Sequence, residues 1–137
     1  EGIPSTIQLH GNESLKRCIE LKENYPKLKF WKAIRIASIE DLDEIKRFEG
    51  FIDAFLLDSW NQQKLGGTGK QIPLKILEKL SIKSPWWLAG GISAESITSS
   101  LLKFNPHGID ASSLLETSPG IKNMAKVKLL IERIKSI

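Results

Sequence analysis

The sequence contains little cysteine, no long apolar stretch and no block of like charges, and each absence narrows the class of protein. The single cysteine, Cys18, excludes an intrachain disulfide and a cysteine-rich metal site. Such cysteine usage fits a reducing compartment, so we expect a cytoplasmic protein. The chain of 137 residues is long enough for one domain, and we expect residues 1–137 to form a single domain.

Membrane and nucleic-acid functions are also disfavoured. No apolar run approaches the roughly 18 residues of a membrane span, and residues 1–4 lack the basic start and apolar core of a signal peptide. The formal charge of +4 comes from 20 basic and 16 acidic residues, and the lysines are scattered along the chain. No basic stripe is interleaved with aromatic residues. We therefore expect a soluble protein with a solvated, mildly basic surface that contacts neither membrane nor nucleic acid.

The apolar pattern alternates between strands and helices. Strands are predicted over 6–10, 30–36, 51–58, 85–89 and 107–111. Helices are predicted over 14–24, 39–48, 73–81 and 93–103, and from Asn123, as N-cap, onward, with a long loop over 59–71. Ser93 is the predicted N-cap of the fourth helix. This alternation predicts an α/β fold with a parallel sheet and right-handed crossovers.

Two architectures satisfy this pattern. One is an open, doubly wound sheet of five strands. The other is part of a (βα)8 barrel, which in full typically takes about 250 residues. Composition does not distinguish these two, so the motifs at the strand ends have to.

Polar residues stand where the predicted strands end. Asp58 ends an apolar run, and carboxylates at this end of parallel strands serve as acids and bases in barrel enzymes. His10 also ends a strand, where either a structural or a chemical role is open. The glycines over 66–70 match neither the phosphate-binding P-loop nor the GxGxxG pattern, so a flexible loop is the simpler interpretation.

Two further strand ends carry features of an anion site. Gly90 and Gly91 follow a strand, and Ser112 and Ser113 follow the next one. Glycine allows close approach to backbone N–H groups, although a tight turn would explain the glycine pair equally well. In (βα)8 enzymes the loops after strands seven and eight frequently bind a phosphate.

Four other residues have predicted structural positions. Cys18 should be a packed thiol on the apolar face of a helix. His107 precedes a strand and should lie on the surface at the opposite end of the sheet. Of the adjacent Trp86 and Trp87, one ring should face the barrel interior and the other the helices.

The strand-end motifs, taken together, resemble one enzyme family. The segments are Ile7-Gln8-Leu9-His10-Gly11, Lys32-Ala33-Ile34-Arg35, Leu56-Leu57-Asp58, Gly66-Gly67-Thr68-Gly69-Lys70, Leu88-Ala89-Gly90-Gly91-Ile92 and Ile109-Asp110-Ala111-Ser112-Ser113. Their order and spacing are similar to those of phosphoribosylanthranilate isomerase, and Glu116 and Ser118-Pro119-Gly120 also look like that family. The resemblance implies a partial (βα)8 barrel of about five βα units, beginning at the fourth strand.

The resemblance also implies a reaction and roles for several residues. The reaction would be the Amadori rearrangement of N-(5-phosphoribosyl)anthranilate in tryptophan biosynthesis, without cofactor or metal. Asp58 matches the family's general acid, and a raised pKa would suit it to that role. His10 and Asp110 match substrate-lining positions. The backbone around Gly90, Gly91, Ser112 and Ser113 matches the phosphate cradle.

The sequence departs from the family pattern in three places. The family's general base is a cysteine in a Lys-x-Cys-Gly motif, and its arginine for the anthranilate carboxylate belongs to an early loop; this sequence has neither. Leu114 stands where the family has glycine after the serine pair. We expect the chain alone to be inactive, and its partner to be either the N-terminal part of the barrel or a second copy joined through open sheet edges.

Two other functions remain possible on this reading. One is a non-catalytic α/β domain that binds a phosphorylated metabolite. The other is a different phosphate-binding barrel enzyme, indole-glycerol-phosphate synthase, although the sequence lacks a matching pair of strand-end lysines for its chemistry.

Overall fold

The structure, a computed structural model, describes residues 2, 4–59 and 71–137. Its centre is a parallel sheet formed by β1 (Thr6–Leu9), β2 (Lys29–Ile36), β3 (Ala54–Ser59), β4 (Trp86–Leu88) and β5 (Gly108–Ile109). These five strands lie side by side in chain order, and each pairs in parallel with the next. A doubly wound sheet reverses its strand order at a switch point. The consecutive order therefore favours the partial barrel over the doubly wound alternative.

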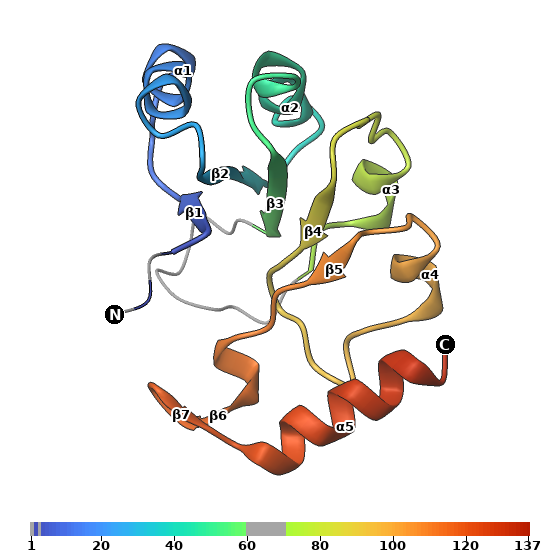
Figure 1. The fold of residues 1–137 in the computed structure, drawn as a ribbon. Coiled ribbons are helices and arrows are strands. Elements are labelled where there is room, and N and C mark those ends of the chain that lie inside the picture. The colour runs from blue at the N-terminus through green and yellow to red at the C-terminus, as the bar shows by residue number, and fades with distance from the viewer. Residues whose placement is uncertain (1, 3, 60–70) are drawn as a thin grey trace.

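Five α-helices accompany the strands, namely α1 (Leu15–Asn24), α2 (Leu42–Phe48), α3 (Leu74–Leu77), α4 (Ser99–Leu102) and α5 (Met124–Lys135). They lie around the outside of the curved sheet, as Figure 1 shows. Within the described residues the sheet is open, with β1 and β5 at its edges, and the barrel is not closed. In this part of the chain no helix is long and apolar enough to cross a membrane.

The two faces of the sheet differ in what they bury. The helix-facing side holds the main core, in which Phe30 and Phe55 are fully buried. The inner face carries a small cluster of Ala33, Leu56 and Ala89 packed with Trp87. This separation is the two-sided burial expected of parallel strands with crossover helices.

The predictions for the tryptophan pair, Cys18 and His107 are confirmed. Trp86 is buried in the helix-facing core, whereas Trp87 belongs to the inner face and stacks on Trp31 with ring centroids 4.0 Å apart. Cys18 is fully buried in the main core. His107 is exposed, and it precedes β5 at the amino end of the sheet.

Two helices begin where side-chain capping predicts. The Ser14 hydroxyl accepts a hydrogen bond from the Arg17 amide at the start of α1. The Asn123 side chain accepts from the amides of Ala125 and Lys126 at the start of α5, so the predicted cap is confirmed. In both cases a local residue satisfies N–H groups that the first helical turn leaves open.

The predicted helix over 93–103 is wrong in its extent. Ser93 starts only a single turn, which the bond from the Ile97 amide to the Ser93 carbonyl closes at 3.0 Å. Thr98 then adopts extended dihedral angles and caps the short α4. The β-branched pair Ile97-Thr98 and the competing Thr98 cap explain the break, because such side chains favour helix ends over interiors.

Three other boundaries differ from the prediction by three residues or more, whereas the remaining strand ends differ by two or fewer. α2 starts at Leu42 instead of residue 39, because the Asp41 carboxylate accepts from the amides of Ala37 and Ser38 and forms a turn. β3 starts at Ala54 instead of residue 51. The side chain of the preceding residue, Asp53, accepts a hydrogen bond from the Phe30 amide at 2.7 Å. α3 ends at Leu77, four residues before the predicted end.

The segment after β5 contains elements that the sequence did not predict. A short 3-10 helix η1 (Ser113–Leu115) is followed by an antiparallel hairpin of β6 (Glu116–Ser118) and β7 (Ile121–Lys122). The predicted loop over 59–71 begins one residue late, since Ser59 ends β3. The rest of that loop, including the glycine motif at 66–70, lies outside the described residues apart from Gln71.

Candidate active site

The carboxyl ends of β1 to β3 bring together a carboxyl group, an imidazole and a guanidinium group. Arg35 and Asp58 are register partners on β2 and β3, and His10 directly follows β1. The His10 Nε2 atom lies 4.0 Å from Asp58 Oδ2. All three side chains belong to the alternating set that faces the inner side of the sheet. The sheet thus places the predicted acid and the predicted lining histidine at one site.

Gln8 orients the histidine ring. Its amide nitrogen donates to His10 Nδ1 at 2.9 Å. When the imidazole is neutral, this bond places its proton on Nε2, the atom that faces Asp58, because an amide NH2 group only donates. Sequence reasoning gave Gln8 no role, although residues two apart on a strand, such as Gln8 and His10, lie on the same face.

The environment of Asp58 raises the pKa of its carboxyl group. Burial is the largest cause, and the negative charge of Asp110 acts in the same direction. The charges of His10 and Arg35 and the backbone amide of Ser59 oppose the rise without cancelling it. Only 29% of the Asp58 side chain is exposed. A carboxyl group that is partly shielded from water and has a raised pKa is suited to donating a proton near neutral pH.

Asp110 lies beyond the end of β5 and is exposed. Its neighbour Ile109 packs against the helix-facing core, so Asp110 belongs to the alternating set on the inner side of the sheet. Its amide donates to the Leu88 carbonyl at 2.8 Å, so the backbone at this strand end is fixed. The negative charge of Asp110 raises the pKa of Asp58, and its role as a substrate contact stays a prediction.

Gly90 and Gly91 form a compact turn after β4. Their φ angles are +84° and +62°, a region that glycine adopts without strain. Gly90 also packs against the end of β3: a β-carbon at this position would lie 2.6 Å from the Ser59 backbone nitrogen. The Gly91 carbonyl accepts a 2.6 Å bond from the Ser96 hydroxyl. The positive φ angles favour glycine at both positions, and the close approach of Ser59 adds a steric requirement at Gly90.

Ser112 and Ser113 lead into η1 and are exposed. In the part of the chain that the structure describes, the amides of Gly91, Ser112 and Ser113 donate no hydrogen bond to any described group. Outward-facing backbone N–H groups in two adjacent loops can bind an anion. Neither loop leads directly into a full helix: Ser93 starts only a single turn, and Ser113 starts the short η1, because α5 begins only at Met124.

Leu114 is half-buried and lines a cavity of about 210 Å³ next to Lys126. That cavity also includes Ser93 and Leu129, so the Leu114 side chain is directed toward α5. At the position where the resemblance predicts glycine, the Leu114 side chain therefore packs beside α5.

Lys32 was missed by sequence reasoning. Its side chain is only 4% exposed, and its Nζ atom donates to the Gly11 carbonyl at 2.6 Å and to Glu13 Oε2 at 2.8 Å. The loop that follows His10 is anchored to the sheet by these bonds. Buried lysines are almost always paired, but a partner 19 residues away leaves no signal in the sequence.

The geometry identifies no metal centre. Among residues 2, 4–59 and 71–137, no group of three or more His, Cys, Asp or Glu side chains could hold a metal ion.

Comparison with known proteins identifies the family. Residues 3–133 match the family model of N-(5'phosphoribosyl)anthranilate (PRA) isomerase. The N-(5'-phosphoribosyl)anthranilate isomerase of Nostoc punctiforme is 40% identical over 130 residues, which cover 95% of this chain and 62% of the relative. The chain thus spans about three fifths of the length of the curated relatives that it matches.

Solved structures agree on the fold. The phosphoribosyl anthranilate isomerase of Thermotoga maritima matches with a TM-score of 0.79 at 25% identity, covering 97% of this chain and 62% of that one. A phosphoribosyl anthranilate isomerase solved in complex with reduced 1-(o-carboxyphenylamino)-1-deoxyribulose 5-phosphate matches with a TM-score of 0.71 at 23% identity, covering 97% and 60%. The strand-end site, the consecutive sheet and these matches agree, and the chain belongs to the N-(5'-phosphoribosyl)anthranilate isomerase family.

Proposed function

We propose that this chain supplies the acid half of an isomerase that converts N-(5-phosphoribosyl)anthranilate to 1-(2-carboxyphenylamino)-1-deoxyribulose 5-phosphate in tryptophan biosynthesis. The observation that carries the proposal is the placement of Asp58, a half-buried carboxyl with a raised pKa at the carboxyl end of β3. Membership of the isomerase family supports this assignment. The reaction is an intramolecular aldose-to-ketose conversion and needs no net oxidant or reductant.

In the proposed mechanism Asp58 acts as the general acid. It gives its proton to the ribose ring oxygen, the C1–O bond breaks, and the nitrogen lone pair forms a Schiff base at C1. A base then removes the C2 proton, and the electron pair left on C2 forms the enolamine. Transfer of the C2 hydroxyl proton toward C1 completes the ketone. The raised pKa of Asp58 keeps a fraction of its carboxyl protonated for the first step.

The substrate phosphate would bind between the loops after β4 and β5. The supporting observation is that the amides of Gly91, Ser112 and Ser113 are not used by any described group. Gly90 supplies the close-packed turn beside them. Two strand-end loops followed by a short extra helix are the usual phosphate site of (βα)8 barrels. A phosphate there leaves the sugar ring extending toward Asp58.

His10 and Asp110 would line the sugar and aniline portion of the substrate. His10 is held by Gln8 and directs Nε2 toward Asp58. Asp110 acts on the same carboxyl group through its charge. We propose that both are substrate contacts, and that Asp58 alone of the three transfers the first proton.

The general base is not provided by this chain. The sequence contains no Lys-x-Cys-Gly motif. Its one thiol, Cys18, is fully buried on the helix side of the sheet, and burial raises the pKa of this thiol. A buried thiol with a raised pKa is a poor base, since the thiolate is the reactive form. We therefore propose that activity requires further βα units, in cis or from a second chain.

The open edges of the sheet and one side of α5 support this requirement. β1 and β5 each lack a second neighbour among the described strands. On α5, Met124 and Ile131 lie on one side of the helix seven residues apart, and both are exposed. An unpaired sheet edge and exposed apolar side chains are both surfaces that another βα unit could cover.

The decisive experiment supplies the remaining three units. The 137-residue chain would be assayed alone and with the N-terminal portion of a family member, by following the loss of substrate fluorescence. We expect no turnover above background from the chain alone and turnover from the combination. Turnover by the chain alone within tenfold of a full-length relative would refute the need for further units. Phosphate binding without turnover in the combination would instead favour a non-catalytic metabolite-binding domain.

A further inference from the structure

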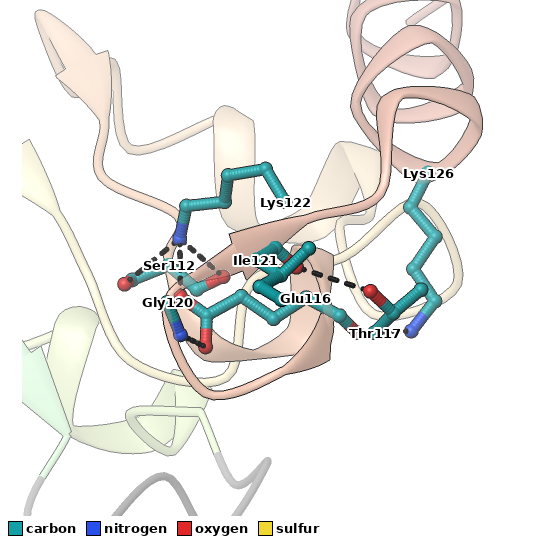
Figure 2. Close-up of polar contacts among 7 residues, drawn as sticks. All are labelled: Ser112, Glu116, Thr117, Gly120, Ile121, Lys122 and Lys126. Atoms are coloured by element: carbon teal, nitrogen blue, oxygen red, sulfur yellow. Dashed lines mark hydrogen bonds and ion pairs between the residues drawn. The ribbon is translucent and has the colours of Figure 1, made fainter.

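The hairpin that follows η1 makes polar contacts with the loop after β5, which carries Ser112 and Ser113. Figure 2 shows Lys122, on β7, directed toward Ser112 and Glu116. Sequence reasoning gave this hairpin no role. Its contacts converge on the residue that opens the proposed phosphate loop, which is why it merits a functional interpretation.

Lys122 uses its ammonium group to join the loop to the hairpin. Its Nζ atom donates to the Ser112 carbonyl at 3.1 Å, to the Ser112 hydroxyl at 3.3 Å and to Glu116 Oε1 at 2.6 Å. An ammonium group has three donors, and here three acceptors receive them. The lysine is therefore occupied by the loop and does not itself extend to a ligand.

Glu116 completes the arrangement from the other side. Its second oxygen, Oε2, accepts from the Gly120 amide at 3.2 Å, and only 16% of its side chain is exposed. The bond from Lys122 is the main cause that holds the pKa of this carboxyl below its usual value. The carboxylate is thus ionised near neutral pH and fixes the lysine against the turn of the hairpin.

The consequence for the loop follows from peptide geometry. The Ser112 carbonyl and the Ser113 N–H belong to one peptide group, and in a trans peptide they point in opposite directions. The Ser112 carbonyl accepts from both Lys122 and the Leu115 amide, at 3.1 and 3.0 Å. Both lone pairs of this oxygen are therefore engaged. Holding the carbonyl also fixes the direction of the Ser113 N–H.

We propose that Lys122 and Glu116 are positioning residues that orient the Ser112–Ser113 peptide for the substrate phosphate. This inference rests on the phosphate site described under Proposed function and adds the residues that set its geometry. The pair acts through Ser112 and does not touch the ligand. Lys122 is 42% exposed, and ion pairs at the surface contribute little to stability, so we expect the effect of the pair in phosphate affinity more than in the melting temperature.

The test titrates the 137-residue chain with inorganic phosphate and follows backbone amides by NMR. Lys122→Met removes the donors, and Lys122→Arg restores a cation with several donors. Lys128→Met is the matched control, because Lys128 pairs with Glu132 at 3.8 Å on α5, away from the loop. We expect Lys122→Met to weaken phosphate binding by about tenfold, as is usual when a well-aimed hydrogen bond to a charged group is lost.

The remaining variants separate positioning from general stability. Lys122→Arg should recover most of the affinity, Lys128→Met should leave it unchanged, and all three should melt near the wild-type temperature. If phosphate shifts the Gly91 and Ser113 amides of the wild type but Lys122→Met binds phosphate equally well, the positioning role is rejected and the phosphate site stands. If the wild-type amides fail to respond to phosphate, the phosphate site itself is wrong and the positioning role fails with it.

Discussion

The imidazole of His10 and the carboxyl group of Asp58 face each other across the end of β2, with Nε2 4.0 Å from Oδ2. The separation is too long for a direct hydrogen bond, but the charge of a protonated imidazole at this distance lowers the pKa of the Asp58 carboxyl group. Asp58 thus remains available to a substrate, while the neighbouring His10 influences the pKa of its carboxyl group.

Replacing Asp58 with asparagine should abolish proton donation while preserving shape. In a barrel completed with the missing units, we expect Asp58→Asn to lower the maximal rate by about 10²–10⁴-fold, the usual contribution of general acid catalysis. The Michaelis constant should change little, because binding rests on the phosphate contacts. Steady-state kinetics would check this result. Normal turnover in the variant would transfer the acid role to Asp110 or His10.

The neighbours of Asp58 should shift the pKa of its carboxyl in opposite directions. Asp110→Asn removes a negative charge and should lower that pKa, whereas His10→Gln removes a charge that lowers it and should raise it. Arg35→Met should produce a smaller rise for the same reason. Burial, the largest cause, is unchanged in all three variants. Carboxyl ¹³C chemical shifts measured across a pH titration would report the signs, and equal shifts in all variants would contradict the arrangement.

The raised pKa of Asp58 also predicts how stability depends on pH. Because the folded state binds this proton more tightly than the unfolded state, the stabilisation is complete below the unfolded pKa and is lost as pH rises through the folded pKa. At neutral pH the buried carboxylate therefore costs stability. Near neutral pH, Asp58→Asn should melt at or above the wild-type temperature, with a free energy of unfolding higher by no more than about 1 kcal/mol. This gain in stability should disappear in acid. A variant less stable at neutral pH would indicate a capping role instead.

Gly90 and Gly50 offer a matched test of close packing. Their φ angles are nearly equal, +84° and +85°, but a β-carbon at Gly90 would collide with Ser59 whereas one at Gly50 would meet nothing within 4 Å. Gly90→Ala should incur both backbone strain and overpacking, each of which costs about 1–3 kcal/mol. Gly50→Ala should incur only the strain. Chemical denaturation would measure both, and equal losses of stability would show that Ser59 moves away without cost.

The sequence by itself determined the strand ends and two of the helix starts. A strand of period two places Trp86 and Trp87 on opposite faces whatever the crossovers do, and Ser14 and Asn123 cap their helices through bonds that span three residues or fewer. These features depend on neighbouring residues only. Local chemistry is therefore enough to predict them.

Only the tertiary structure decided the contacts that shape the site. Lys32 reaches Glu13 across 19 positions, and Lys122 reaches Ser112 across 10. The hairpin formed by β6 and β7 appeared in a segment for which no element was predicted. For Lys32 and Lys122 the deciding partner is distant in the sequence and is brought close by the fold. At the buried Lys32 an unpaired ammonium group would be costly, so the arrangement that pairs it is favoured.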